Sequence, residues 1–194
     1  HGILALLKSV LVVTLVIEGI GMVLSFLVFV KTSAPLEALG MSAFHSIAAF
    51  NNSGFDLLGG FNSMVGYRAD VLLNLVTCAL IILGGLGFFV MRDMWIKRSF
   101  RKLTLQSKVV LTTTIFFLIA GTLLLKLSDG AMTWLEAFFQ STSARTAGFA
   151  TYPMGLMSNA GLIVMCVLMF IGASPGSTGG GIKTTTIFTL AHIF

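Results

Sequence analysis

The sequence predicts an all-α integral membrane protein in which a helix–loop–helix unit occurs twice. Hydrophobic residues make up 56% of the 194 residues and charged residues only 10%, whereas soluble domains are about 25% charged. Long stretches carry no charge, and part of one half of the sequence recurs in the other. The composition excludes a water-soluble or a disordered chain, because too few polar residues are present to cover a folded surface in water.

Four apolar stretches are long enough to cross a bilayer. A helix of about 20 residues spans a hydrocarbon core of about 30 Å. The first stretch contains only Lys8 and Glu18 as charges, and the second and third contain none. We therefore predict four transmembrane helices, over residues 3–30, 71–91, 109–125 and 158–194, the last of them broken.

Two shorter apolar segments lie between these predicted helices. Residues 36–50 and 131–144 are too short to span a membrane, and each leads into a stretch that contains glycine with asparagine or threonine. This pattern is typical of a re-entrant pore helix followed by an extended loop. Such backbone occurs at membrane depth only where it is buried in protein or lines a watery pathway.

Residues 92–108 carry half of the twelve basic side chains: Arg92, Lys97, Arg98, Arg101, Lys102 and Lys108. The positive-inside rule places this basic loop in the cytoplasm and both pore loops on the extracellular side. One cluster between apolar segments does not predict nucleic-acid binding, which needs basic residues along a groove. Contact with anionic lipid is the simplest role for the loop.

The order of elements repeats along the chain. Ala43, Phe44, Gly54 and Phe55 match identical residues 94 positions later, and Lys8 and Gly21 match identical residues 100 positions later. We divide the chain into two units of first helix, pore loop and second helix, residues 1–92 and 109–194, joined by the basic residues 93–108. Two parallel units cannot close a pore, so we expect further copies, most simply four in all. A first residue other than Met favours missing sequence as their source.

A glycine-containing segment follows each predicted pore helix. A potassium filter replaces the water shell of the ion by backbone carbonyls, and glycine permits the dihedral angles this requires. The pore helix presents the partially negative end of its dipole to the cation. The candidate filter residues, where K⁺ is the one metal ion expected, are Asn52, Ser53, Gly54 and Phe55, and Thr146, Ala147, Gly148 and Phe149. The alternative is a pair of buried turns.

The fourth membrane segment contains a run that cannot form a regular helix. Residues 172–183 include a proline and five glycines, which cost about 3 and about 1 kcal/mol each inside a helix. A break at membrane depth indicates a pathway or a hinge, so we expect a loop that plugs the pore or swings aside. The candidate gate residues are Gly172, Ser174, Pro175, Gly176, Ser177, Thr178, Gly179, Gly180, Gly181 and Lys183. A phosphate-binding loop is disfavoured, because its strand–loop–helix context is missing.

Two charged residues in apolar surroundings are candidates for a supporting role. Glu18 lies within the first membrane helix, where it either attracts cations, pairs with Arg145, or orders the scaffold as a buried partner. Arg145 directly precedes the second filter segment. Because a fixed positive charge on the pore axis would repel potassium, we expect Arg145 to turn away and to brace the loop through a carboxylate such as Glu136 or Asp56.

The stretches AFNNSGFD, FFQSTSARTAGFATYPMG and FIGASPGSTGGGIKTTT resemble the membrane subunit of Ktr-type bacterial potassium transporters, in the Trk/Ktr/HKT superfamily. The resemblance covers nearly the whole chain. It implies four units around one pore, of which this chain is similar to the second and third, with Gly54 and Gly148 as filter glycines and residues 172–183 as an intramembrane loop beneath the filter. It also implies a homodimer in the bacterial inner membrane, and a cytoplasmic nucleotide-binding regulatory ring that the basic loop could dock.

The expected function is potassium translocation through a carbonyl-lined filter gated by an intramembrane loop, in an uptake or symport system. We expect no enzyme activity and no covalent cofactor, because neither a catalytic triad nor an acid–base carboxylate pair stands out. We expect K⁺ as the transported ion and leave open whether Na⁺ is transported or coupled with it. A regulatory nucleotide is expected on the partner subunit and not on this chain. The alternatives are a secondary transporter of another substrate that uses broken helices and a membrane enzyme or scaffold.

Overall fold

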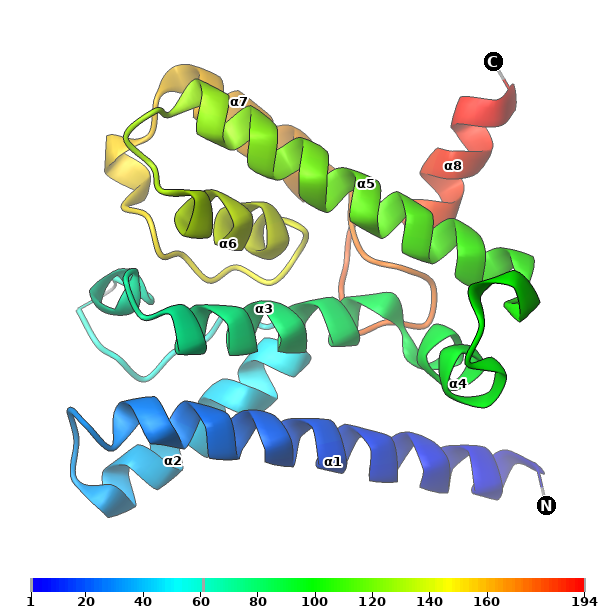
Figure 1. The fold of residues 1–194 in the computed structure, drawn as a ribbon, viewed down its shortest axis with the longest axis horizontal. Helices are drawn as coiled ribbons and strands as arrows, with labels where there is room; N and C mark the ends of the chain where they lie inside the picture. Colours follow the sequence, from blue (N-terminus) through cyan, green and yellow to red (C-terminus); the bar gives the residue numbers. More distant parts are fainter. Residues whose placement is uncertain (1, 61, 194) are drawn as a thin grey trace.

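The structure is a computed structural model that describes residues 2–60 and 62–193. These residues form helices and loops, with one isolated β-bridge between Ile171 and Ile182. The predicted all-α class is therefore confirmed. The helices, labelled as in Figure 1, are α1 (Gly2–Phe29), α2 (Pro35–Phe50), η1 (Val65–Tyr67), α3 (Val71–Leu86), α4 (Phe88–Lys97), η2 (Phe100–Lys102), α5 (Leu105–Ser128), α6 (Trp134–Ala144), η3 (Met154–Leu156), α7 (Asn159–Phe170) and α8 (Thr184–Ile193).

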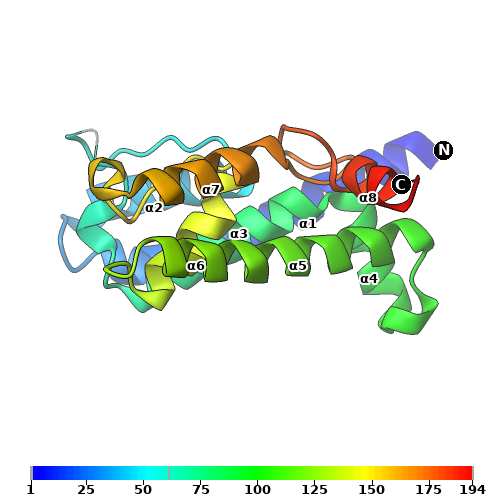
Figure 2. The same ribbon diagram turned by 90° about the horizontal axis from the view of Figure 1, so that it is seen from above.

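The two predicted units are visible as two sets of helices with the same contacts. In the first, α1 packs on α2 and on α3; in the second, α5 packs on α6 and on α7. The long helices α1, α3 and α5 run along the longest axis of the molecule (Figure 1). The short helices α2 and α6 both pack against α3, so α3 joins the two units. Helix α3 lies between α5 and α1 (Figure 1), and α7 runs beside α5 (Figure 2).

Local capping explains where several helices begin. The side chains of Asp70, Thr104 and Ser158 each accept a hydrogen bond from a backbone N–H in the first turn of α3, α5 and α7. Helix α6 begins with a capping box, in which Thr133 and Glu136 satisfy each other's backbone N–H groups. The second pore helix therefore starts after Thr133 and not at residue 131 as predicted.

By length and composition, two described helices could cross a membrane unbroken, Leu7–Phe29 and Leu105–Ser128, and a third span is possible if α3 and α4 are counted as one bent pair. The four predicted spans therefore stay a prediction, but their bounds differ from those of the helices. The helix predicted over 71–91 ends at Leu86, and the chain turns by 96° into α4. Gly87, with φ of 84°, forms this turn, because a left-handed backbone is easily accessible only to glycine. Helix α7 has 12 residues, about 18 Å, and is followed by the predicted break, which is confirmed.

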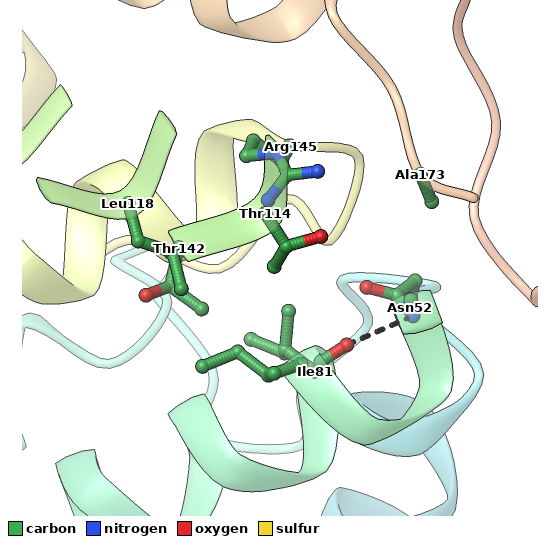
Figure 3. A pocket seen from close by; sticks show the side chains of 9 residues that line it. Asn52, Ile81, Thr114, Leu118, Thr142, Arg145 and Ala173 are labelled. Carbon is green, nitrogen blue, oxygen red and sulfur yellow. Dashed lines mark hydrogen bonds between the residues drawn. The ribbon is translucent and has the colours of Figure 1, made fainter. Parts of the chain in front are cut away.

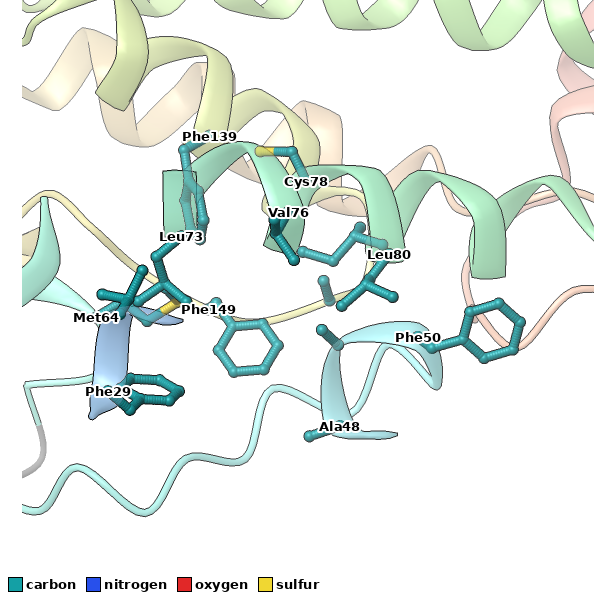
Figure 4. Packing of buried hydrophobic residues seen from close by; sticks show 14 of the residues in the cluster. Phe29, Ala48, Phe50, Met64, Leu73, Val76, Cys78, Leu80, Phe139 and Phe149 are labelled. Carbon is teal, nitrogen blue, oxygen red and sulfur yellow. The ribbon is translucent and has the colours of Figure 1, made fainter. Parts of the chain in front are cut away.

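The largest hydrophobic core is shared by the two units. Figure 4 shows Phe29 and Leu73 of the first unit near Phe139 and Phe149 of the second, in one hydrophobic cluster. His45 lies inside this core, with its ring 5.4 Å from that of Phe149. Its Nε2 lies 2.8 Å from the hydroxyl of Thr77. Because that hydroxyl gives its one proton to the Leu73 carbonyl, Nε2 of His45 is the donor. His45 is a core residue, as expected.

Candidate functional site

The two predicted filter segments meet in the middle of the molecule. Each follows directly on a pore helix, since α2 ends at Phe50 and α6 at Ala144. A Cβ atom on Gly54 would stand 2.5 Å from the carbonyl oxygen of Ala147. Only glycine permits this approach. The structure therefore brings 52–55 and 146–149 together, although they are 94 positions apart in the sequence.

Both segments share an unusual backbone pattern. Asn52 and Gly54 have φ of 53° and 70°, and the equivalent Thr146 and Gly148 have 85° and 92°. The residue between each pair has no positive φ. Non-glycine residues with positive φ are uncommon and cluster at functional sites. The repetition of the pattern at equivalent positions shows that the two segments adopt the same special conformation.

The carbonyl groups of these segments are largely free. In the described part of the chain, no N–H or O–H donates to the backbone oxygens of residues 52–55 or 146–148. Of these two segments, the Phe149 oxygen has a partner, the hydroxyl of Ser143 at 2.5 Å. Free backbone oxygens at the C-terminal ends of two pore helices are ligands suited to a cation.

Each pore helix is anchored to the first helix of its own unit by a serine. The hydroxyl of Ser46 donates to the Glu18 carbonyl at 2.6 Å, and that of Ser141 to the Leu118 carbonyl at 3.1 Å. Opposite each serine is a glycine. A Cβ atom on Gly21 would lie 2.5 Å from the Ser46 hydroxyl oxygen, and one on Gly121 would collide with that of Ser141. The sequence repeat identified Gly21 and Gly121 but not the two serines. The serines are 95 positions apart, so they do not align when the halves are matched at the filter spacing of 94.

The predicted gate forms a closed loop between α7 and α8. The N–H of Gly172 donates to the carbonyl of Ile182 and that of Ala173 to Gly180, each at 3.0 Å. Two candidate gate serines make contacts within the loop or at its end: the hydroxyl of Ser177 donates to the Ser174 carbonyl at 2.5 Å, and the hydroxyl of Ser174 lies 3.3 Å from that of Thr184. Nζ of Lys183 donates to the Gly179 carbonyl at 2.7 Å, so this ammonium closes the loop.

Thr178 connects this loop to the first filter segment. Its hydroxyl donates to the Phe50 carbonyl at 2.9 Å and accepts from the amide nitrogen of Asn52 at 2.8 Å. The contact depends on Gly84 in α3, where a Cβ atom would collide with the Phe50 carbonyl and stand 2.9 Å from the Thr178 hydroxyl. On the other side, a Cβ on Gly179 would lie 2.6 Å from the hydroxyl of Thr146. The loop thus touches both filter segments.

The loop also holds the turn between α3 and α4. The N–H of Ser174 donates to the Gly85 carbonyl at 3.0 Å, and the N–H of Phe88 donates to the Gly176 carbonyl at 3.2 Å. A Cβ atom on Gly87 would lie 2.9 Å from the Pro175 carbonyl. The glycines of α3, for which close packing was expected, therefore pack against the loop, and Gly87 in addition ends the helix.

Arg145 turns away from the filter but does not meet a carboxylate. Its Nη2 donates to the Gly172 carbonyl at 3.3 Å, and its residue is only 8% exposed. The expected partner Glu136 instead caps α6 and lies 3.8 Å from Arg68. The expectation of a carboxylate brace is wrong, because the first turn of α6, where Glu136 sits, is at the opposite end of the helix from Arg145.

A small cavity of about 20 Å³, lined by polar and apolar side chains, lies beside Arg145. Figure 3 shows Asn52, Thr114, Thr142 and Arg145 around it, from both units. In the described part of the chain, Nε of Arg145 and Oδ1 of Asn52 have no hydrogen-bond partner. The space is large enough for about one water molecule. Arg145 is therefore placed between the filter and the loop, with only one of its donors engaged by protein.

Glu18 pairs with the residue that aligns with Arg145, and not with Arg145 itself. Its Oε1 accepts from the amide nitrogen of Asn51 at 3.1 Å. Asn51 ends α2 as Arg145 ends α6. Of the three roles considered for Glu18, this contact favours ordering of the scaffold, since Glu18 supports the end of the pore helix.

No group of three His, Cys, Asp or Glu side chains suitable for a metal ion occurs in the described residues. Cys78 is buried and Cys166 exposed, and both are free thiols. The charged contacts within residues 2–60 and 62–193 are Arg68 with Glu136 and Lys97 with Asp93. The arrangement offers backbone oxygens in place of a clustered side-chain site.

Comparison with known proteins identifies the family of the chain. The family model described as a cation transport protein, TrkH, matches residues 1–112 and again residues 103–194. The chain belongs to the TrkH family. Each match contains one helix–loop–helix unit, and the expected relationship to the Trk/Ktr superfamily is confirmed. The TrkH-family chain is therefore part of a multi-pass membrane protein, and its named relatives are transporters and not enzymes.

Several relatives of this TrkH-family chain carry names that state a transported ion. The potassium/sodium uptake protein NtpJ of Enterococcus hirae is 40% identical, over 96% of this chain and 43% of that protein. The Ktr system potassium uptake protein B of Vibrio alginolyticus is 39% identical, over 93% and 42%. The crystal structure of the potassium transporter TrkH from Vibrio parahaemolyticus matches with a TM-score of 0.70 at 23% identity, over 95% of this chain and 39% of that one. The chain therefore has the TrkH fold and spans less than half the length of these relatives.

Proposed function

We propose that this chain contributes two quarters of a potassium pathway, with residues 52–55 and 146–149 as parts of its selectivity filter. Relatives of the chain are named as potassium uptake proteins. The proposal rests on one observation above all: within residues 2–60 and 62–193, no donor reaches the seven backbone oxygens of residues 52–55 and 146–148, at the ends of two pore helices. Free carbonyls can replace the hydration shell of K⁺.

The packing of the two filter phenylalanines supports further units around the same axis. Phe149 of the second unit is 1% exposed and packs into the first unit, against His45 and Phe29. The equivalent Phe55 is 68% exposed. If each unit inserts this phenylalanine into its neighbour, Phe55 is the residue that another unit would cover. A ring of four units would satisfy both residues, in line with the length of the relatives.

The 172–183 loop is proposed as the gate. It contacts both filter segments through Thr178 and Gly179, and Arg145 holds its first residue. Its ends are short helices, and its five glycines permit a change of conformation. A loop in this position blocks the pathway when it is held and opens it when its hydrogen bonds are exchanged.

The setting follows from the same proposal. The transporter would lie in a bacterial plasma membrane, with residues 92–108 cytoplasmic and the pore loops extracellular, because of the positive-inside rule. A homodimer and a cytoplasmic nucleotide-binding regulatory subunit are proposed as partners, since two relatives are named as components of Ktr systems. K⁺ is the proposed cargo, and Na⁺ as a coupling ion is left to experiment.

The test is rubidium uptake by cells that lack their own potassium uptake and express the full-length protein. Gly148→Ser places a side chain at φ of 92° beside Gly54, and we expect loss of the preference for rubidium and potassium over sodium. Gly155→Ser is the control, because a Cβ atom there meets nothing within 4 Å. Unchanged selectivity in Gly148→Ser would mean that 146–149 is a structural turn, and absence of rubidium uptake by the unaltered protein would exclude potassium as the cargo.

A further inference from the structure

The end of the molecule at α4 combines a sharp turn of the chain, exposed apolar side chains and a cluster of basic residues. Helix α4 leaves the axis of α3 at 96°, and Figure 1 shows it almost end-on, at the end where α1 begins and α8 lies. If α3 crosses a bilayer, a helix at this angle lies nearly in the membrane plane. The element comprises α4, η2 and the start of α5, residues 88–105.

Large apolar side chains on this element are exposed. Trp95 is 77% exposed, Ile96 64% and Leu105 78%, and Phe100 is also more than half exposed. These residues belong to a short surface-lying element and not to the long apolar faces of α1 or α5. Leaving such side chains in water costs about 25 cal/mol for each Å², so an apolar surface in contact with them would be favourable.

Cations without acidic partners surround these side chains. The one acid nearby, Asp93, is engaged by Lys97 at 2.7 Å and by the hydroxyls of Thr104 and Ser107. In the described part of the chain, no carboxylate pairs with Arg92, Arg101 or Lys102. The guanidinium of Arg98 lies over the Trp95 ring, 5.8 Å from its centre. The element is therefore strongly positive.

We propose that residues 92–105 form an interfacial anchor that binds anionic phospholipid. Trp95, Ile96 and Leu105 would enter the boundary between headgroups and acyl chains, and the unpaired cations would contact lipid phosphates. Tryptophan with Lys and Arg on one element is the composition favoured at membrane interfaces. The turn at Gly87 places the element parallel to the bilayer, which a contact with a soluble protein would not require. This proposal does not depend on the identity of the transported ion.

The test measures the depth of one residue in vesicles. A spin label is attached at Ile96→Cys in the full-length protein, after replacement of Cys78, Cys166 and any other native cysteine. The protein is reconstituted in phosphatidylcholine alone or mixed with phosphatidylglycerol, and the collision rates of the label with oxygen and with a water-soluble nickel chelate are compared. We expect the ratio of oxygen to nickel collisions to rise in the vesicles that contain phosphatidylglycerol.

A charge variant separates lipid binding from simple burial. Each cation near an anionic surface favours attachment about fivefold, so the triple variant Arg98→Gln, Arg101→Gln, Lys102→Gln should abolish the effect of phosphatidylglycerol. Lys31→Gln, an exposed cation between α1 and α2, should leave it unchanged. A label at position 96 that the nickel chelate reaches equally in both vesicles would overturn the proposal, whatever the variant does. The proposal would also be overturned if the label became protected from the nickel chelate only when cytoplasmic protein is added, because the element would then be a protein-docking site.

Discussion

Gly54 and Gly148 face each other at the centre of the molecule. A Cβ atom on Gly54 would stand 3.0 Å from the Cα of Gly148, and one on Gly148 would stand 3.4 Å from the Cα of Gly54. Both residues have positive φ. A side chain on Gly54 would crowd the backbone of Gly148, and the positive φ disfavours a side chain at either position, so this pair sets the distance between the two proposed filter segments.

Gly54→Ala should therefore impair transport far more than its backbone strain alone would. Gly59→Ala is the matched control, because Gly59 has nearly the same φ, 76° against 70°, but an open surrounding. The additional collision with the Ala147 carbonyl costs on the order of 2 kcal/mol, about thirtyfold in the population of the native filter. Rubidium uptake is the measurement. Equal activity of the two variants would show that the contact between the segments is not needed.

The seam between first helix and pore helix offers a comparison of stability. A Cβ on Gly21 would collide with the Ser46 hydroxyl and with Leu80, whereas one on Gly19 meets nothing within 4 Å. The gain in helix propensity on changing Gly to Ala is the same at both sites and cancels. We expect Gly21→Ala to be less stable than Gly19→Ala by about 1–3 kcal/mol. The thermal midpoints of the purified full-length variants in detergent would test this; coinciding midpoints would contradict it.

Thr178→Val should weaken the closed position of the 172–183 loop. The change removes the hydrogen bond to the Phe50 carbonyl and the acceptor of the Asn52 amide. Two such bonds are worth about 1–3 kcal/mol together, so we expect basal rubidium uptake to rise about fivefold or more, with selectivity retained. Ser177→Ala is the control, because its hydroxyl bonds only within the loop. Uptake that stays at the basal level in both variants would mean that the Thr178 contact does not limit opening.

Asp93 should order the link between α4 and α5 over the whole neutral range. The Lys97 ammonium, and then the hydrogen bonds from Thr104 and Ser107, hold the pKa of Asp93 well below its ordinary value. A carboxylate with a lowered pKa contributes stability above its unfolded pKa of about 4 and loses it as the pH falls through the folded pKa. The protection factors of residues 98–107, which are the intrinsic exchange rates at each pH divided by the observed rates, should then not change between about pH 5 and pH 8, since the carboxylate stays ionised in that range.

Replacing this carboxylate gives the complementary result. Asp93→Asn removes the charge that Lys97 contacts, and we expect faster exchange of residues 98–107 at both ends of that pH range. Glu37→Gln, at an exposed acid in the first turn of α2, should have no effect there. Protection factors of these residues in the unaltered protein that fall from pH 8 to pH 5 would refute the assignment of a lowered pKa.

Much of this molecule could be predicted from the sequence because its signals are local. The apolar runs that became α1 and α5, the pore helices ahead of Asn52 and Thr146, and the glycine-rich break after Phe170 each lie within a short window. The repeat at 94 positions then related the two halves before any contact was known. The filter and gate roles of these segments remain predictions, with geometry that supports them.

Other features were decided only by the tertiary structure. Nothing local in the run from Gly84 to Gly87 distinguishes a packed helix from a broken one, and the break is held by Phe88 and Gly176, which are distant in the sequence. Arg145 found a carbonyl of the loop in place of a carboxylate, because the fold brings Gly172 to the end of α6. The sequence determined which segments form helices and where glycine interrupts them, through propensity and hydrophobicity within each segment. The contacts between those segments depend on packing of residues far apart in the chain, and only the folded structure specifies them.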